Sequence, residues 1–159
     1  MIMKQITLTQ GKIALVDDSG FDMLSKFKWF ANKFNGKWYA VRSFGTRKTK
    51  KGSIMMHREI MKTVKGMDTD HIDGDGLNNQ RKNLRACTHS ENSCNRGKQK
   101  NNTSGFKGVT WNKTGKTWQA QIKVKNKYIY LGCSPSESFA YKMYVEGCEK
   151  YHGKFSNSN

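Results

Sequence analysis

Residues 68–85 read DTDHIDGDGLNNQRKNLR. A short extended segment contains the pair Asp70–His71 and is followed by a polar turn rich in Gly, Asp and Asn. A second extended segment then starts at Asn83, in the run NLRAC. Two short extended segments joined by many turn-forming residues predict a β-hairpin with a long connecting loop.

A helix is predicted directly after this hairpin. Thr88 and Glu91 are three residues apart, which is the spacing of a capping box at the start of a helix. Residues 68–96 therefore predict strand, loop, strand and helix in that order, with Asn92 in the first turn of the helix.

This pattern contains the residue types that phosphodiester hydrolysis needs. A histidine can take a proton from water near neutral pH, and a divalent cation can neutralise charge on the phosphate. Asp70 and Asn92 offer the hard oxygen atoms that such a cation prefers. Asp70 and His71 are neighbours on an extended segment, so their side chains point to opposite sides. The alternative is a polar surface hairpin with no chemistry.

The charge of the chain also indicates a polyanionic partner. Its 159 residues include 29 Lys and Arg against 12 Asp and Glu, for a formal charge of +17. Residues 70–95 are slightly acidic, whereas residues 96–132 contain nine basic residues and no acidic one. A cation favours the first segment and phosphates favour the second. A merely soluble basic protein and a ribosome-type structural component are the alternatives.

The remaining composition restricts the class of protein. Only 35% of residues are hydrophobic, so we expect small modules rather than one large core. The four cysteines form no Cys-x-x-Cys pair, so we expect reduced, mostly buried thiols and no zinc ribbon. We find no apolar run suited to a signal peptide or membrane span, and expect a cytoplasmic protein without a membrane partner.

The N-terminal part predicts a small β-rich element. Residues 4–18 and 28–43 each predict a hairpin, the second with an Asn-Gly turn, and residues 19–27 predict a short helix between them. Residues 46–53 predict a basic loop, and residues 54–61 a strand that runs into a short helix. We expect this element to brace the hairpin of residues 68–85.

The last sixty residues predict a three-stranded antiparallel sheet covered by one helix. The strands are expected at residues 105–111, 116–124 and 127–132, and the helix at residues 134–153. Ser134 is the expected cap, with Pro135 at the first position. An apolar stripe on the helix matches an apolar sheet face, so alternation directs the polar strand residues to the open face.

The stretch D-H-I-D-G-D-x-L-x-N-x-x-x-N-L-R followed by E-N-x-x-N resembles the HNH nuclease motif of phage and intron homing endonucleases, which have a ββα-metal fold. By this resemblance His71 is the general base, Asn83 positions it, and Asp70 and Asn92 bind a divalent cation, Mg²⁺ or Mn²⁺. Many HNH proteins have His where this chain has Asn92. His57 lies in a segment similar to the family's His-Arg element; it is interpreted as a phosphate or outer-shell contact, or as a packed structural histidine.

Residues 101–158 resemble the plant APETALA-two/ethylene-response-factor DNA-binding domain. The similar segments are SGFKGVTW, GKTWQAQIKV, YLG and the helix that ends YHGKFSNSN. The resemblance implies a sheet that lies in the major groove of double-stranded DNA, although most of that family's arginines are missing. Trp111 and Trp118 are interpreted equally well as core residues. The implied DNA-binding residues are Thr110, Asn112, Trp118, Gln121, Lys123 and Tyr130.

Together these features predict an α+β protein with an HNH nuclease domain at residues 1–96, a basic linker at 97–105 and a DNA-binding domain at 106–159. We expect a homing- or phage-type endonuclease that acts as a monomer, nicks one strand of DNA, uses no small-molecule substrate and is phage-encoded. One alternative is a non-catalytic DNA-binding regulator with a degenerate nuclease fold. Another is an RNA-binding structural protein, which would not need the Asp-His-Asn spacing.

Overall fold

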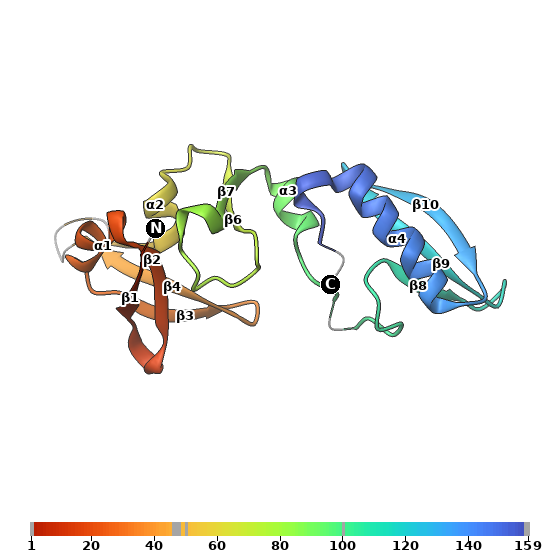
Figure 1. Ribbon diagram of the computed structural model, residues 1–159, viewed down its shortest axis with the longest axis horizontal. Coiled ribbons are helices and arrows are strands. Elements are labelled where there is room, and N and C mark those ends of the chain that lie inside the picture. The colour runs from red at the N-terminus through yellow and green to blue at the C-terminus, as the bar shows by residue number, and fades with distance from the viewer. Residues whose placement is uncertain (1, 46–48, 50, 100, 158–159) are drawn as a thin grey trace. The chain divides into compact units, whose positions relative to one another are not determined.

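The computed structural model describes residues 2–45, 49, 51–99 and 101–157, and groups the chain into two compact units, Met1–Thr88 and His89–Asn159. The first unit combines small antiparallel sheets with short helices, and the second combines an antiparallel sheet with helices (Figure 1), which confirms the predicted α+β class. Much of the predicted basic loop, residues 46–48 and 50, lies outside the described residues. Within the described ranges, no helix has the length and apolar character needed to cross a membrane.

The described residues of the first unit form three small antiparallel sheets. A two-stranded sheet pairs β1 with β2, a three-stranded sheet has the order β3-β4-β5, and a hairpin pairs β6 with β7. The strands are β1 Met3–Thr7, β2 Ile13–Asp17, β3 Phe30–Phe34, β4 Lys37–Phe44, β5 Gly52–Met55, β6 Asp68–His71 and β7 Leu84–Cys87. The helices are η1 Thr9–Gly11, α1 Asp18–Ser25, α2 Met56–Met61 and η2 Arg81–Asn83.

Both N-terminal hairpins form as predicted. The β3–β4 connection is the two-residue turn Asn35–Gly36, with φ of 49° and 85°. Two consecutive positive φ values match the right-handed twist of the strands, and Asn and Gly adopt them most readily. The β1–β2 connection has positive φ at Gln10 and Gly11.

One hydrophobic core joins the N-terminal sheets to the region of the motif. Leu24 from α1 and Met56 from α2 are completely buried in it, and Leu77 from the β6–β7 loop packs against it. The β-rich element thus braces the hairpin of residues 68–85, as expected. The other buried members of this core are Ile6, Leu8, Ala14, Val16, Trp29, Ala31 and Ala40.

The second unit has the predicted three-stranded sheet and long helix. Its sheet has the order β10-β9-β8, and α4 packs on one face of it. The buried residues of this core are Val109, Ala120, Ile122, Ala140, Tyr144 and Cys148. The elements are α3 His89–Cys94, β8 Val109–Asn112, β9 Thr117–Val124, β10 Lys127–Ser134, α4 Glu137–His152 and η3 Gly153–Phe155.

The start of α4 differs from the prediction. Ser136, rather than Ser134, is the N-cap, and its hydroxyl accepts a hydrogen bond from the backbone N–H of Phe139 at 3.4 Å. Ser134 is still part of β10, where it is paired with Trp118, and its hydroxyl accepts a bond from the Ser136 N–H. Pairing in the sheet therefore extends two residues farther than the sequence indicated.

Candidate active site

The β6–β7 hairpin brings the Asp-His pair opposite the Leu-Arg pair of the motif. In its antiparallel register Asp70 faces Arg85 and His71 faces Leu84. Asp70 and His71 are 6% and 5% exposed. Helix α2 packs against both strands, so the pair is supported from the N-terminal side of the chain.

Asn83 clamps the loop that connects the two strands. Its amide nitrogen donates to the Asp73 carboxylate at 2.9 Å and to the Asn78 carbonyl at 2.8 Å. Its amide oxygen accepts from the Asp73 backbone N–H at 3.1 Å. Asn83 thus fixes the segment that immediately follows His71.

The other acidic residues of the motif shape this loop. Asp73 accepts bonds from the Asp75 backbone N–H at 2.8 Å and from the Asn78 amide at 2.7 Å, and Asp75 accepts one from the Leu77 N–H at 2.9 Å. Burial raises the pKa of Asp73, but these hydrogen bonds and that from Asn83 outweigh it and hold the pKa below its ordinary value. Asp73 and Asp75 therefore stabilise the conformation of the turn.

Strand β2 anchors the far side of the same loop. The Leu15 N–H donates to the Leu77 carbonyl at 2.9 Å, and the Asn79 N–H donates to the Leu15 carbonyl at 2.8 Å. The Asp17 carboxylate accepts from the Arg81 N–H at 2.7 Å. The loop is consequently tied to an element sixty residues earlier in the chain.

The position of Asn79 indicates which ring nitrogen of His71 carries the proton. Its amide nitrogen donates to the Leu77 carbonyl at 3.0 Å, which orients the amide oxygen towards His71 Nε2 at 3.5 Å. An amide oxygen can only accept, so Nε2 carries the proton in the neutral ring. The basic nitrogen of His71 is then Nδ1.

The surroundings of His71 favour its neutral form. Burial lowers the pKa of His71, and the Asn79 bond and the carboxylates of Asp73, Asp70 and Asp75 offset this only in part. An imidazole with a lowered pKa is already deprotonated at neutral pH, as a general base must be.

Arg85 holds the Asp70 carboxylate. Its Nε and a terminal nitrogen both donate to Asp70 Oδ2, at 2.8 and 2.6 Å. The side chains of Arg85 and Asp70 are only 15% and 7% exposed. This pair fixes the orientation of the carboxylate next to His71.

The predicted metal ligands belong to different elements. Asp70 lies on β6, whereas Asn92 lies on α3 in the second unit, and its role as a ligand stays a prediction. A carboxylate and an amide oxygen are suited to Mg²⁺ or Mn²⁺ with water and phosphate completing the shell. Among the described residues, no group of three or more His, Cys, Asp and Glu side chains is placed to hold a metal.

Most of the predicted DNA-binding residues lie on the sheet face opposite α4. Gln121 pairs across the strands with Tyr130, and Lys123 pairs with Tyr128. They alternate with the buried residues Ala120 and Ile122, so they face away from the core. Tyr130 is 60% exposed. Thr110, on β8, is also exposed.

Two other predicted DNA-binding residues have different surroundings. The Asn112 side-chain oxygen accepts the backbone N–H groups of Thr114 and Gly115, at 3.1 and 3.2 Å, and so caps its own turn. Trp118 is half-buried against the core and packs edge-on against Trp111, with ring centroids 5.0 Å apart. Their roles in binding DNA stay predictions.

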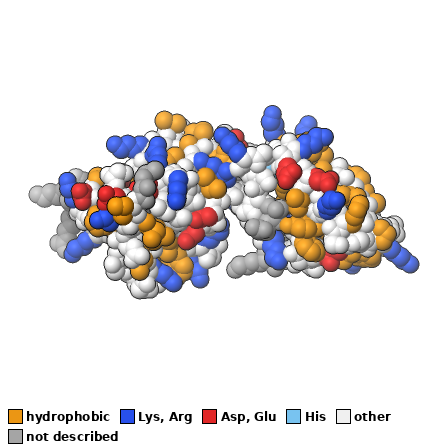
Figure 2. All heavy atoms as spheres, viewed as in Figure 1, with side chains coloured by type: hydrophobic (Ala, Val, Ile, Leu, Met, Phe, Trp, Pro, Cys, Tyr) orange, Lys and Arg blue, Asp and Glu red, His pale blue; other side chains and the backbone are white. Residues whose placement is uncertain are grey.

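A basic groove of about 1060 Å³ lies within the second unit. It runs past α3, residues 96–99 and residues 101–103 to the open face of the sheet, where Gln121, Lys123 and Tyr128 line it. Arg96, Lys98 and Lys125 add positive charge, and no acidic residue is among its described lining residues. On the face drawn in Figure 2, Lys and Arg side chains are found on both units.

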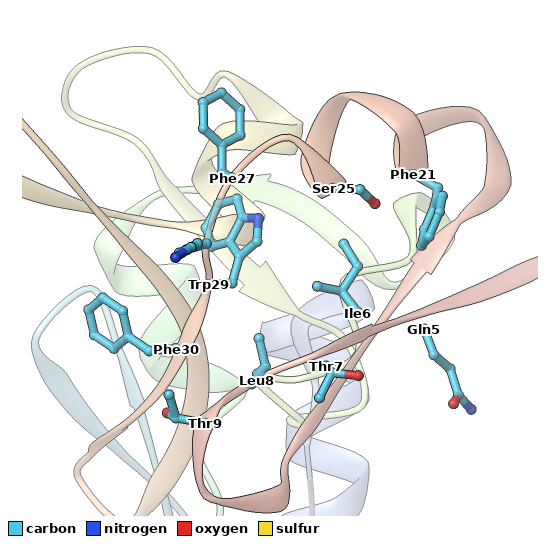
Figure 3. Close-up of a pocket in the computed structure, with 11 residues that line it drawn as sticks. Gln5, Ile6, Thr7, Leu8, Thr9, Phe21, Ser25, Phe27, Trp29 and Phe30 are labelled. Atoms are coloured by element: carbon cyan, nitrogen blue, oxygen red, sulfur yellow. The ribbon is translucent and has the colours of Figure 1, made fainter.

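A separate hollow of about 590 Å³ lies in the first unit, beside β1 (Figure 3). Residues 5–9 line one side, and Phe21, Phe27, Trp29 and Phe30 supply aromatic walls. No residue of the predicted site lines this hollow, and we assign it no role in the reaction.

Comparison with known proteins identifies the region of the hairpin. Residues 62–94 match the HNH endonuclease family. The match covers a fifth of the chain and includes Asp70, His71, Asn83 and Asn92. The chain therefore carries an HNH endonuclease domain signature, which supports a nuclease acting on DNA.

Two viral proteins are similar to this chain. Protein 3.8 of Escherichia phage T7 is 43% identical over 63 residues, which are 40% of this chain and 52% of that protein. An uncharacterized HNH endonuclease of Acanthamoeba polyphaga mimivirus is 29% identical over 157 residues, which are 94% of this chain and 76% of that protein. The alignment with the phage protein thus spans about half of its length.

Three residues around the HNH site were not assigned roles from the sequence. Arg85 is part of the motif, and the strand register could have placed it opposite Asp70. Asn79 is also part of the motif, but its contact with His71 depends on how the loop folds. Tyr39 is far away in sequence and carries no local signal; its ring lies 6.0 Å from that of His71.

Proposed function

We propose that this protein is a metal-dependent HNH DNA endonuclease of the homing or phage type. The observation that carries the proposal is the buried His71, whose Nε2 lies 3.5 Å from the Asn79 side-chain oxygen, next to the buried Asp70 carboxylate. A base with a defined tautomer beside a hard oxygen ligand suits hydrolysis of a phosphodiester.

Each residue of the motif has one role in this proposal. His71 Nδ1 takes a proton from the attacking water, while Asn79 holds the opposite edge of the ring. Asn83 keeps the connecting loop closed so that the ring stays in place. Asp70 and Asn92 would hold Mg²⁺ or Mn²⁺, which when bound supplies positive charge to the phosphate and the leaving oxygen. Arg85 keeps the Asp70 carboxylate oriented.

We assign the choice of DNA site to residues 106–159, through an APETALA-two/ERF-like sheet, with residues 97–105 as a basic linker from a nuclease domain at 1–96. The basic groove beside the open sheet face supports this assignment, because Lys and Arg neutralise phosphates while Gln and Lys can contact base edges. Tyr128 and Tyr130 add exposed aromatic surface next to these residues.

The expected product is a nick. One active centre in a monomer cuts one strand in each binding event, and a double-strand break would need a dimer or two successive cuts. Similarity to a phage protein supports a phage-encoded enzyme that works in the cytoplasm of a bacterial host.

A plasmid assay tests the proposal. Supercoiled DNA incubated with the protein and Mg²⁺ or Mn²⁺ should become open circles; EDTA should abolish the conversion, and His71→Ala should reduce it to a trace. If the wild type shifts DNA in a gel but never cuts it with any divalent ion, the protein is a non-catalytic DNA-binding regulator. Sequencing the cleaved ends gives the site and the strand.

A further inference from the structure

Three aromatic rings from separate elements lie close together at the β6–β7 hairpin. His57 from α2 packs edge-on against His71 from β6, with ring centroids 4.8 Å apart and planes at 81°. The ring of Tyr39 from β4 lies 5.9 Å from His57 and 6.0 Å from His71. Tyr39 therefore contacts both histidines.

The surrounding backbone holds both supporting rings in place. His57 is 5% exposed and follows Met56, which is completely buried in the core of the first unit. Tyr39 lies directly under the loop after His71: a Cβ on Gly76 would be 2.6 Å from the Tyr39 ring and 2.3 Å from the Trp38 carbonyl oxygen. Only glycine allows the loop to approach so closely.

The His71 ring is thus held on two sides. Asn79 fixes its Nε2 edge, and His57 and Tyr39 pack against the ring itself. A histidine side chain has two rotatable bonds, and misplacing a reacting group by about 1 Å can cost about a hundredfold in rate. The packing of His57 and Tyr39 therefore restricts rotation of the His71 ring more than the single long hydrogen bond to Asn79 can.

The charge state of His57 is consistent with a packing role. Burial, helped by His71 and Arg58 and opposed by Asp68, lowers the pKa of His57 to about 3. An uncharged ring contributes contact area without adding a positive charge beside the base.

We propose that Tyr39 and His57 are positioning residues that hold His71 in its working orientation. The inference rests on the proposed function and adds to it two residues outside the matched range of 62–94. In this role the ring shape of His57 matters and its nitrogen atoms do not.

Ring-conserving and ring-deleting variants of the full chain test this role. His57→Ala and Tyr39→Ala should each lower kcat for nicking by about 10- to 100-fold with KM for DNA changed less than about twofold. His57→Phe and Tyr39→Phe should recover kcat to within about threefold of the wild type. If His57→Phe is as inactive as His71→Ala, then His57 takes part in the chemistry and the proposal is overturned. Wild-type kcat in His57→Ala also overturns it.

Two further measurements separate positioning from general destabilisation. Ile6→Ala removes buried apolar volume from the same core at a position outside the three-ring cluster; it should lower the unfolding midpoint and leave kcat unchanged where the protein is folded. In the His71→Ala background, His57→Ala should cause no further loss of residual nicking. An additional loss there would show that His57 acts independently of His71 and would overturn the proposal.

An NMR readout does not depend on cleavage. The chain has four histidines, so its ring Cε1–H region is simple to assign with His57→Phe and His71→Ala. Tyr39→Leu should shift the His71 signal because it removes an aromatic ring 6.0 Å away, whereas Tyr39→Phe should not. An unchanged His71 signal in Tyr39→Leu contradicts the positioning role. If instead wild type and His71→Ala both fail to cut DNA while the ring contacts are confirmed, only the proposed function fails.

Discussion

Asp70 and Arg85 are direct cross-strand neighbours, and the guanidinium donates two hydrogen bonds to a single oxygen of the carboxylate. The pair is largely shielded from water. It holds the carboxylate that we assign to the metal, and it has consequences for stability that can be measured without any DNA.

Arg85→Ala should destabilise the protein by about 3 kcal/mol, because it removes the cation from a buried carboxylate. The measurement is urea unfolding followed by tryptophan fluorescence. Arg58→Ala is the matched control: Arg58 is 53% exposed and bonds Asp68 at 3.3 Å, so its loss should cost less than about 1 kcal/mol. Equal losses in the two variants would contradict the importance of the buried pair.

Asn83→Asp should be more harmful than Asn83→Ala. The carboxylate cannot donate to Asp73 or to the Asn78 carbonyl, and it places a second negative charge beside Asp73. We expect nicking to fall by more than about tenfold and amide exchange to accelerate in residues 72–80. Hydrogen-exchange mass spectrometry checks the second effect; protection equal to that of the wild type would show that Asn83 does not clamp the loop.

Stability should fall on acidification partly because of His57. Its pKa is lowered from 6.5 to about 3 in the folded protein, so between these values the unfolded chain binds a proton that the folded chain does not. Above about pH 6.5 His57 is neutral in both states and does not lower the free energy of unfolding. Below that pH its protonation in the unfolded chain lowers the free energy of unfolding, by at most about 1.4 kcal/mol per pH unit. Unfolding curves from pH 7 to pH 4 should therefore be less steeply pH-dependent for His57→Phe. Parallel pH dependences would be inconsistent with a buried neutral His57.

Lys107 should act as a structural residue rather than as a phosphate contact. Its Nζ donates to the carbonyls of Cys94 and Asn157, at 2.9 and 2.6 Å, and burial lowers its pKa. Lys107→Met should cost about 1–3 kcal/mol in unfolding free energy. DNA affinity of the folded variant, measured by fluorescence anisotropy, should fall no more than for Lys113→Met, which changes an exposed turn residue. A far larger loss of affinity would show instead that Lys107 contacts DNA phosphates.

Gln121→Ala combined with Lys123→Ala should reduce site preference more than the basal rate of cutting. Both residues face away from α4 on the open sheet face, where Gln can pair with adenine and Lys can contact guanine or phosphate. Competition between a preferred site and random DNA measures the ratio. Lys150→Ala, on α4, is the control for lost charge. Equal weakening on every sequence would contradict a role in site choice.

Local patterns predicted most of the elements. Asn35–Gly36 fixed a turn, and the alternation around Ala120 and Ile122 correctly separated the covered face of the sheet from the open one. The end of β10 was misplaced because Ser134 and Ser136 are both good caps, and only strand pairing distinguishes them. The ring contacts of His71 could not be predicted for a different reason. Tyr39 and His57 lie on other elements and meet His71 only through tertiary packing, which leaves no periodic pattern in the sequence.

The two hydrogen bonds between Leu15 and the loop residues Leu77 and Asn79 limit how the proposed nuclease can be shortened or transplanted. A fragment that starts at residue 62, where the family match begins, would contain every motif residue but would lack the strand that shapes their loop. Grafting such a fragment onto another protein should yield an inactive hairpin unless the recipient supplies an equivalent strand edge. The smallest transferable unit is therefore the proposed domain of residues 1–96, which keeps both Leu15 and Asn92, and engineered fusions should be joined after residue 96 rather than begun at residue 62.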